Sequence, residues 1–162
     1  MTADTIKGEV VNSILVAFKE KNTRIGDACT YTSYMAKDIL KNIFGLNAEL
    51  KAGELHFNDF PVYYAWNPPE EFHMWLELDG EKIDIAIAGL LQREEFQKGG
   101  KFYRYRNHGF DVVWERFPYG GQIYKEVNGG VDMISPPDDE DDYKELLESA
   151  YNYIRNQEYR NK

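Results

Sequence analysis

Apolar residues recur at helical spacing near both ends of the chain, and this periodicity predicts a helix at each end. The N-terminal pattern covers roughly 3–20, with Ile6, Val10, Val11, Ile14, Leu15 and Phe18. The C-terminal pattern covers 139–159, with Tyr143, Leu146, Leu147, Ala150, Tyr151 and Ile154. The acidic run at 138–142 suits the first turn of that helix, where the dipole is positive. Such a run is also typical of disordered tails, but the apolar stripe favours a packed helix.

A second helix is predicted from about 27 to 44. Asp27 is placed to cap it, and Gly45 stands where a helix commonly ends in a left-handed residue. Its inward face combines small and apolar residues, namely Cys29, Ser33, Ala36, Leu40 and Ile43. Small residues at the start of this face would let the helix approach a sheet closely.

After Gly45 the pattern changes to that of strands, punctuated by pairs of glycines. We expect strands at 46–52, 60–66, 72–79, 81–87, 101–106, 110–117 and 122–127, and a short helix near 89–98. Helices, then a run of mostly antiparallel strands, then a helix make an α+β fold. The length of 162 residues suits a single domain over 1–162.

The clearest local signal is a hairpin at 73–87 that turns at Asp79-Gly80, a preferred pair for a two-residue turn. This turn pairs Leu78 with Glu81 and, further along, Trp75 with Asp84. One face is then apolar: Met74, Leu76, Leu78, Ile83, Ile85 and Ile87. His73 and Asp84 share the other face as diagonal neighbours, close enough for the carboxylate to reach the imidazole.

Composition and charge narrow the class of function. A net charge of −9 argues against nucleic-acid or anionic membrane partners. The basic and aromatic stretch 101–106 could contact a phosphate chain, but an exposed strand is the better interpretation. One cysteine excludes an internal disulfide and fits a reducing compartment. Because neither a signal peptide nor a 20-residue apolar span is seen, we expect a cytoplasmic protein.

The single cysteine, Cys29, is predicted to lie in the first turn of the second helix. Unpaired backbone N–H groups and the helix dipole favour the thiolate there, and the thiolate is the nucleophilic form. A lone cysteine is more often a small buried hydrophobe, so this position alone does not decide its role.

Four pieces of sequence, in order, resemble the transglutaminase-like core shared with papain-like peptidases. They are Gly26-Asp27-Ala28-Cys29, Gly45-Leu46-Asn47-Ala48, His73-Met74-Trp75-Leu76-Glu77 and Lys82-Ile83-Asp84-Ile85-Ala86. The region is roughly 25–90. The resemblance implies a catalytic triad of Cys29, His73 and Asp84. The sequence departs from the family pattern in two ways. The gap between His73 and Asp84 is short, and the tryptophan that often precedes the aspartate is missing.

These residues predict thiol-dependent acyl transfer through a thioester, as in a peptidase, amidase, deamidase or transamidase. The substrate would be a peptide or protein amide, or a small amide or thioester. Trp66 or Tyr64 could complete an oxyanion hole, and Trp75 could shield the site. A silent peptide-binding relative is the alternative.

Metal binding by Cys29, His73 and Asp84, with His56 or His108, is the least favoured interpretation. No pair of these residues has the close spacing of a zinc site. We therefore expect neither a metal nor a cofactor, and the sequence leaves the oligomeric state open.

Overall fold

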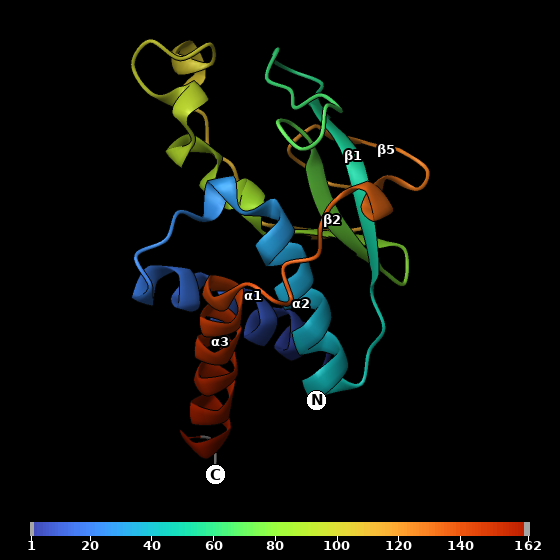
Figure 1. Ribbon diagram of the computed structural model, residues 1–162, viewed down its shortest axis with the longest axis vertical. Helices are drawn as coiled ribbons and strands as arrows, with labels where there is room; N and C mark the ends of the chain where they lie inside the picture. Colours follow the sequence, from blue (N-terminus) through green and yellow to red (C-terminus); the bar gives the residue numbers. More distant parts are fainter. Residues whose placement is uncertain (1, 161–162) are drawn as a thin grey trace.

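The protein, described from a computed structural model over residues 2–160, is an α+β molecule that combines three helices with a curled antiparallel sheet. The helices are α1 (Ala3–Glu20), α2 (Cys29–Phe44) and α3 (Asp141–Arg160). The strands are β1 (Glu49–Phe57), β2 (His73–Leu78), β3 (Glu81–Asp84), β4 (Val113–Glu115) and β5 (Gln122–Glu126). They run in the order β4-β3-β2-β1-β5, each antiparallel to its neighbours. Figure 1 shows the helices below and the sheet above.

The three helices were all predicted, because each has a stripe of apolar residues. Helix α1 begins and ends where expected. Helix α3 packs along α1 and buries Tyr143, Leu146, Ala150 and Ile154. Gly45 ends α2 with a left-handed φ of 69°, as expected.

The start of α2 differs from the prediction. Asp27 does not cap the helix but lies in a short 3-10 turn, η1 (Ile25–Asp27), and pairs with Arg24. The residue at the N-cap is Ala28, and no side chain caps the first turn. The carboxylate of Asp27 is therefore drawn into an ion pair, and Cys29 becomes the first residue of α2.

The predicted hairpin register is confirmed. Leu76 pairs with Ile83, Glu77 with Lys82 and Leu78 with Glu81. Asp79 and Gly80 both have positive φ, 52° and 83°, as a type I′ turn requires. Strand β3 nevertheless ends at Asp84, short of the predicted 87, because the chain turns into the 3-10 helix η2 (Ala86–Gln92).

Two other strand predictions were wrong, and three further strands exist with bounds that differ from those expected. Segment 60–66 contributes only a bridge from Tyr64 to Leu55, in a stretch where Pro61, Pro68 and Pro69 cannot donate backbone hydrogen bonds. Segment 101–106 is not a strand; it contains the 3-10 helix η4 (Tyr103–Tyr105). The first strand, expected at 46–52, runs from Glu49 to Phe57, and those expected at 110–117 and 122–127 are shortened to β4 and β5.

The helix expected near 89–98 is also only partly right. This stretch is made of 3-10 turns, the end of η2 and then η3 (Glu94–Phe96), and together with η4 they form an extended arm over residues 86–110 (Figure 1). Its aromatic side chains are turned inward, and Phe96 and Phe102 are buried.

Two groups of buried side chains hold the fold together. The first lies between the helices and the sheet and includes Met35, Ile39, Met74, Leu76 and Ile83. The second lies under the arm; it comprises Leu55, Phe57, Val62, Tyr64, Ile87, Leu90, Phe96, Phe102, Phe110 and Val113. Strand β1 serves both, because successive side chains of a strand point to opposite faces.

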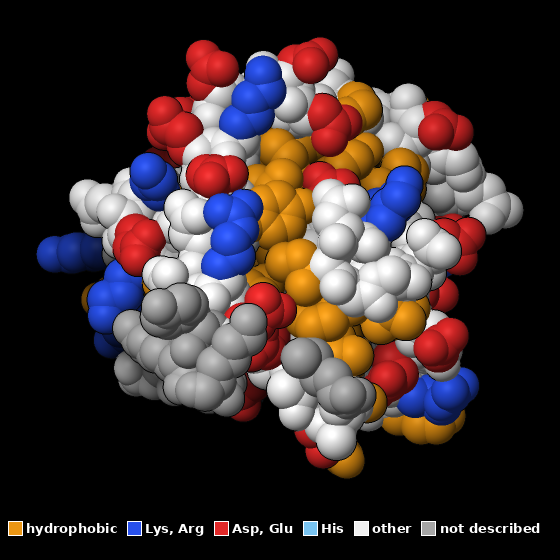
Figure 2. Space-filling view, turned by 90° about the horizontal axis from the view of Figure 1, so that it is seen from below, with side chains coloured by type: hydrophobic (Ala, Val, Ile, Leu, Met, Phe, Trp, Pro, Cys, Tyr) orange, Lys and Arg blue, Asp and Glu red, His pale blue; other side chains and the backbone are white. Residues whose placement is uncertain are grey.

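The surface carries mixed charge around a band of visible apolar side chains when the molecule is seen from below (Figure 2). Over the described residues, no helix is both long enough and apolar enough to span a bilayer.

Candidate active site

The residues predicted to form a triad meet where the start of α2 approaches the hairpin of β2 and β3. His73 is the first residue of β2 and Asp84 the last of β3. Nε2 of His73 lies 2.6 Å from Oδ2 of Asp84, a short hydrogen bond. The side chains of His73 and Asp84 are 4% and 1% exposed, so the pair is shielded from water.

The thiol of Cys29 is close enough to the imidazole to act on its pKa. Burial disfavours a charged imidazole, but the carboxylate of Asp84 and then the thiol of Cys29 outweigh it by charge and hydrogen bonding, and they raise the pKa of His73 to about 10. Because Asp84 bonds to Nε2, the nitrogen left to face the sulfur is Nδ1. The carboxylate and the thiol thus both act on the same imidazole.

The first turn of α2 presents free backbone donors beside the sulfur. The first residue whose N–H is bonded within α2 is Thr32, which donates to the carbonyl of Ala28. The N–H groups of Cys29, Thr30 and Tyr31 precede it, and neither a capping side chain nor an acidic residue in the first turn competes for them. This positive helix end stabilises negative charge on the sulfur or on an oxyanion next to it.

The turn before Cys29 is locked to the segment after Asp84. A β-carbon on Gly26 would overlap the carbonyl oxygen of Gly89, so only glycine allows η1 to touch η2. The amide of Gly26 donates to Gln92 at 3.2 Å, and Arg93 donates to the carbonyl of Gly26 at 3.2 Å. Since η2 directly follows β3, these contacts set the position of Cys29 relative to the hairpin.

Trp75 packs beside the imidazole, as the shielding role requires. It is 1% exposed, and its ring lies 6.2 Å from that of His73 with an angle of 20° between the planes. Its indole N–H and Oδ1 of Asp84 are both buried and without a hydrogen-bond partner among the described residues. Both atoms belong to side chains on the same face of the hairpin.

Trp66 and Tyr64 lie in different surroundings. Trp66 packs against the first buried group, which also contains Cys29, and its ring contacts Phe72 edge-on at 6.5 Å. Tyr64 belongs to the second group, where the guanidinium of Arg93 lies 4.7 Å above its ring. Of the two candidate oxyanion donors, only Trp66 therefore shares a buried group with Cys29.

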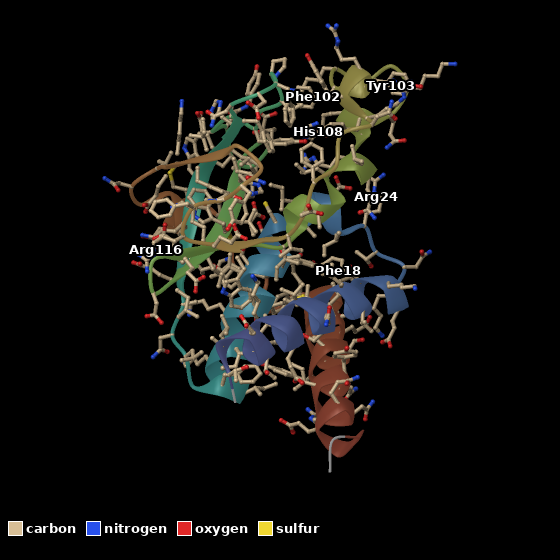
Figure 3. All side chains as sticks on the ribbon, turned by 180° about the vertical axis from the view of Figure 1, so that it is seen from behind. Phe18, Arg24, Phe102, Tyr103, His108 and Arg116 are labelled. Carbon is tan, nitrogen blue, oxygen red and sulfur yellow. The ribbon has the colours of Figure 1, made fainter. Side chains whose placement is uncertain are left out.

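The remaining histidines are engaged elsewhere. His56 bonds to Glu54 at 2.9 Å and stacks on Tyr63. His108 packs on Phe60 within the aromatic side chains of the arm (Figure 3). Within residues 2–160, no three His, Cys, Asp or Glu side chains gather as a metal site would require.

Tyr124 is part of the site, although the sequence did not point to it. Its hydroxyl donates to Oδ2 of Asp84 at 2.8 Å, the same oxygen that bonds to His73. Tyr124 is on β5, and the pairing of β5 with β1 is a contact between distant segments. No short-range pattern could have revealed it.

A shallow pocket of about 400 Å³ opens beside the start of α2. Both chain neighbours of Cys29, Ala28 and Thr30, line it, together with Tyr31 and the ion pair of Arg24 and Asp27. The side chain of Cys29 is itself only 8% exposed. The pocket therefore lies next to Cys29, which is not among the residues that line it.

Comparison with known proteins adds evidence on the fold. No protein-family model and no curated protein match the chain. A solved crystal structure, named only as the genomics target APC5867, is similar with a TM-score of 0.59. The likeness covers 95% of this chain and 80% of the other, at 16% sequence identity. At that identity the likeness concerns the fold and says nothing of the chemistry.

Proposed function

We propose that this protein is a thiol-dependent acyl-transfer enzyme, built on a transglutaminase-like core, in which Cys29 is the nucleophile. The observation that supports the proposal is the buried hydrogen bond between His73 and Asp84 beside the single cysteine of the sequence. Asp84 holds His73 by a 2.6 Å bond, and Cys29 is close enough to the imidazole to raise its pKa. A nucleophile beside a base that a third group orients is the arrangement required for covalent catalysis.

Each side chain has a defined role in the reaction. Since the pKa of His73 is raised to about 10, its Nδ1 already holds the proton given up by the Cys29 thiol, and the thiolate of this ion pair attacks the carbonyl carbon of an amide or thioester. The sulfur–carbon bond forms as the carbonyl electrons move to oxygen, and the free N–H groups of the first turn of α2 face that negative charge. The carbon–leaving-group bond then breaks, and His73 returns its proton to the departing amine or thiol.

The acyl group is left on Cys29 as a thioester. Water attacks it in a peptidase, amidase or deamidase, and an amine attacks it in a transamidase. In either case His73 again accepts a proton from the incoming nucleophile. The proposed substrate is a peptide or protein amide, or a small amide or thioester, whose acyl side chain lies in the pocket lined by Ala28 and Thr30.

Labelling with iodoacetamide tests the proposal directly, because the chain has one cysteine and each adduct therefore reports on Cys29. At about pH 6 a free thiol of pKa ~8.5 is almost fully protonated, whereas a thiolate paired with imidazolium reacts. We expect alkylation at least about tenfold faster than that of a short cysteine peptide, and loss of this advantage in His73→Asn.

The matched control is His108→Asn, which changes an imidazole of the arm and leaves the triad intact. It should be alkylated like the unchanged protein. An activated aryl ester tests the second step, since intact mass should show a transient acyl adduct that Cys29→Ala lacks. Labelling no faster than the peptide in the native protein would contradict the proposal.

A binding module on the same fold is the second candidate, and the connection between β4 and β5 favours it. Phe117 is 79% exposed and Tyr119 92% exposed, although aromatic side chains usually find cover. If binding is the function, Phe117→Ser with Tyr119→Ser should abolish the biological effect and Cys29→Ala should leave it unchanged. The reverse pattern would support the enzyme.

A further inference from the structure

Tyr124 reaches the triad from the far edge of the sheet. Strand β5 lies three positions from β3, which in a flat sheet is roughly 14 Å at about 4.8 Å per strand. A tyrosine and an aspartate could not bridge that distance side by side. The 2.8 Å bond between them therefore exists only because the sheet curls, bringing β5 over β2 and toward β3.

Gly53 of β1 is paired with a neighbouring strand on both sides. It pairs with His73 on one side and with Glu126 on the other. A β-carbon on Gly53 would overlap the backbone carbonyl of Lys125. The absence of a side chain there lets β5 come close beside the strand that neighbours His73.

The ring of Tyr124 is held as well as its hydroxyl. Its centroid lies 5.0 Å from the ring of Trp75 and 6.1 Å from that of His73. Burial, followed by the charge and hydrogen bond of Asp84, raises its pKa well above the ordinary value for tyrosine. The phenol therefore keeps its proton at all working pH values and acts as a donor to Asp84.

We propose that Tyr124 is a positioning residue that fixes the carboxylate of Asp84 and weakens the attraction of this carboxylate for the proton of His73. This proposal rests on the proposed function of the site. The imidazole of His73 and the hydroxyl of Tyr124 both bond to the same oxygen of Asp84, Oδ2. The phenol disperses carboxylate charge that would otherwise act on the imidazolium alone. His73 can then release its proton to a leaving group more readily than a pair of Asp84 and His73 without Tyr124 would allow.

The proposal predicts how His73 titrates. The titratable groups that face its ring are Asp84 from β3, Cys29 from α2 and Tyr124 from β5, and Trp75 beside it carries no charge. In Tyr124→Phe the aromatic packing remains and one donor to Asp84 is lost. The carboxylate then interacts with the imidazolium without a competing donor, so the protonated form of His73 is stabilised. The titration midpoint of His73 should therefore move upward by roughly 1 pH unit.

Nitrogen-15 NMR of the full chain measures this midpoint without a substrate. Three histidines give a simple spectrum, and His56 and His108 serve as internal references that should not move. The matched control is Tyr143→Phe, which removes another buried phenol–carboxylate bond, that of Tyr143 to Asp38 at 2.7 Å. It should lower stability and leave the midpoint of His73 unchanged.

Two outcomes separate this proposal from the function on which it rests. If iodoacetamide labels native Cys29 rapidly but Tyr124→Phe leaves the midpoint and the ring orientation of His73 unchanged, the role of Tyr124 is refuted and the enzyme stands. If native Cys29 is no more reactive than a free thiol, the enzyme itself is refuted. A ring-fluorinated tyrosine at 124, a stronger donor, should move the midpoint downward, and this serves as the test should Tyr124→Phe not fold.

Discussion

At the scale of single residues, the imidazole of His73 decides how the site responds to pH. It is buried beside the carboxylate of Asp84, and its pKa is raised from 6.5 to about 10. A group whose pKa is higher in the folded chain binds its proton more tightly there than when unfolded. Its contribution to stability is therefore complete below pH 6.5 and is lost as the pH rises toward 10.

We therefore expect the free energy of unfolding to fall between pH 6.5 and pH 10, by an amount on the order of 3 kcal/mol. Urea denaturation at a series of pH values measures it. Asp84→Asn should be less stable at neutral pH, and its stability should hardly change across this window. His108→Gln, which leaves the pair intact, should keep the full decline. A decline of equal size in Asp84→Asn would show that another group is responsible.

The sequence could suggest the candidate triad of Cys29, His73 and Asp84, but not the contact that Tyr124 makes with it. His73 and Asp84 could be paired from the sequence because both lie in one hairpin whose turn sets the register. Tyr124 could not, since its bond to Asp84 depends on a strand order and a curl that no local pattern encodes. The capping role of Asp27 was predicted wrongly because Arg24, three residues earlier, captures its carboxylate.

At the scale of elements, the contact between η1 and η2 sets where α2 begins. Gly26 and Gly89 touch without side chains between them, and Gln92 and Arg93 bond to the backbone of Gly26. Cys29 is thus tied to the segment that follows Asp84. A change at this contact should displace Cys29 from His73.

Gly26→Ala should lower the free energy of unfolding by about 1–3 kcal/mol, because the new methyl group overlaps backbone that cannot move aside freely. Alkylation of Cys29 at mildly acidic pH should slow at the same time. Gly8→Ala is the matched control: a methyl group on this residue of α1 would meet no atom within 4 Å, so alanine there should stabilise the helix by up to about 1 kcal/mol. Unchanged labelling in a folded Gly26→Ala protein would show that this contact does not position the thiol.

Elements were predictable from sequence where their signals are local. The three helices and the hairpin each carry an internal periodicity or turn. The arm has no such local signal. The alternation of residues from Lys101 to Arg106 resembles that of a strand, but the backbone forms 3-10 turns. The guanidinium carbon of Arg106 lies 4.0 Å from the ring centroid of Tyr103. Burial of Phe96 and Phe102 against distant residues of β1 overrides that local pattern.

At the scale of the whole molecule, the two buried groups are physically joined, although they lie on opposite faces of the sheet. Strand β1 places Ala52 in the first group and Leu55 and Phe57 in the second. The chain from Ile85 to Ile87 passes from one group to the other directly after Asp84. The proposed triad thus lies where both groups meet, and loss of either group should disturb it.

We therefore expect the helices, sheet and arm to unfold as one unit. Leu146→Ala removes a buried side chain of the first group and Phe96→Ala one of the second, each 2% exposed in the native fold. Each should lower the free energy of unfolding by about 2–5 kcal/mol and shift the same single transition. Tryptophan fluorescence follows Trp66, Trp75 and Trp114, while near-ultraviolet circular dichroism also follows the tyrosines of the arm, and the two curves should coincide.

Neighbouring exposed positions supply the controls, since Glu145→Ala and Lys98→Ala change the same elements without touching either buried group. Both should unfold within about 0.5 kcal/mol of the unchanged protein. If Phe96→Ala produced a separate early transition in the tyrosine signal alone, the arm would be an independent unit. Cys29 would then still be alkylated rapidly after the arm had unfolded. If unfolding is cooperative, the rapid alkylation of Cys29 and the ordered structure of the arm should instead be lost in the same transition.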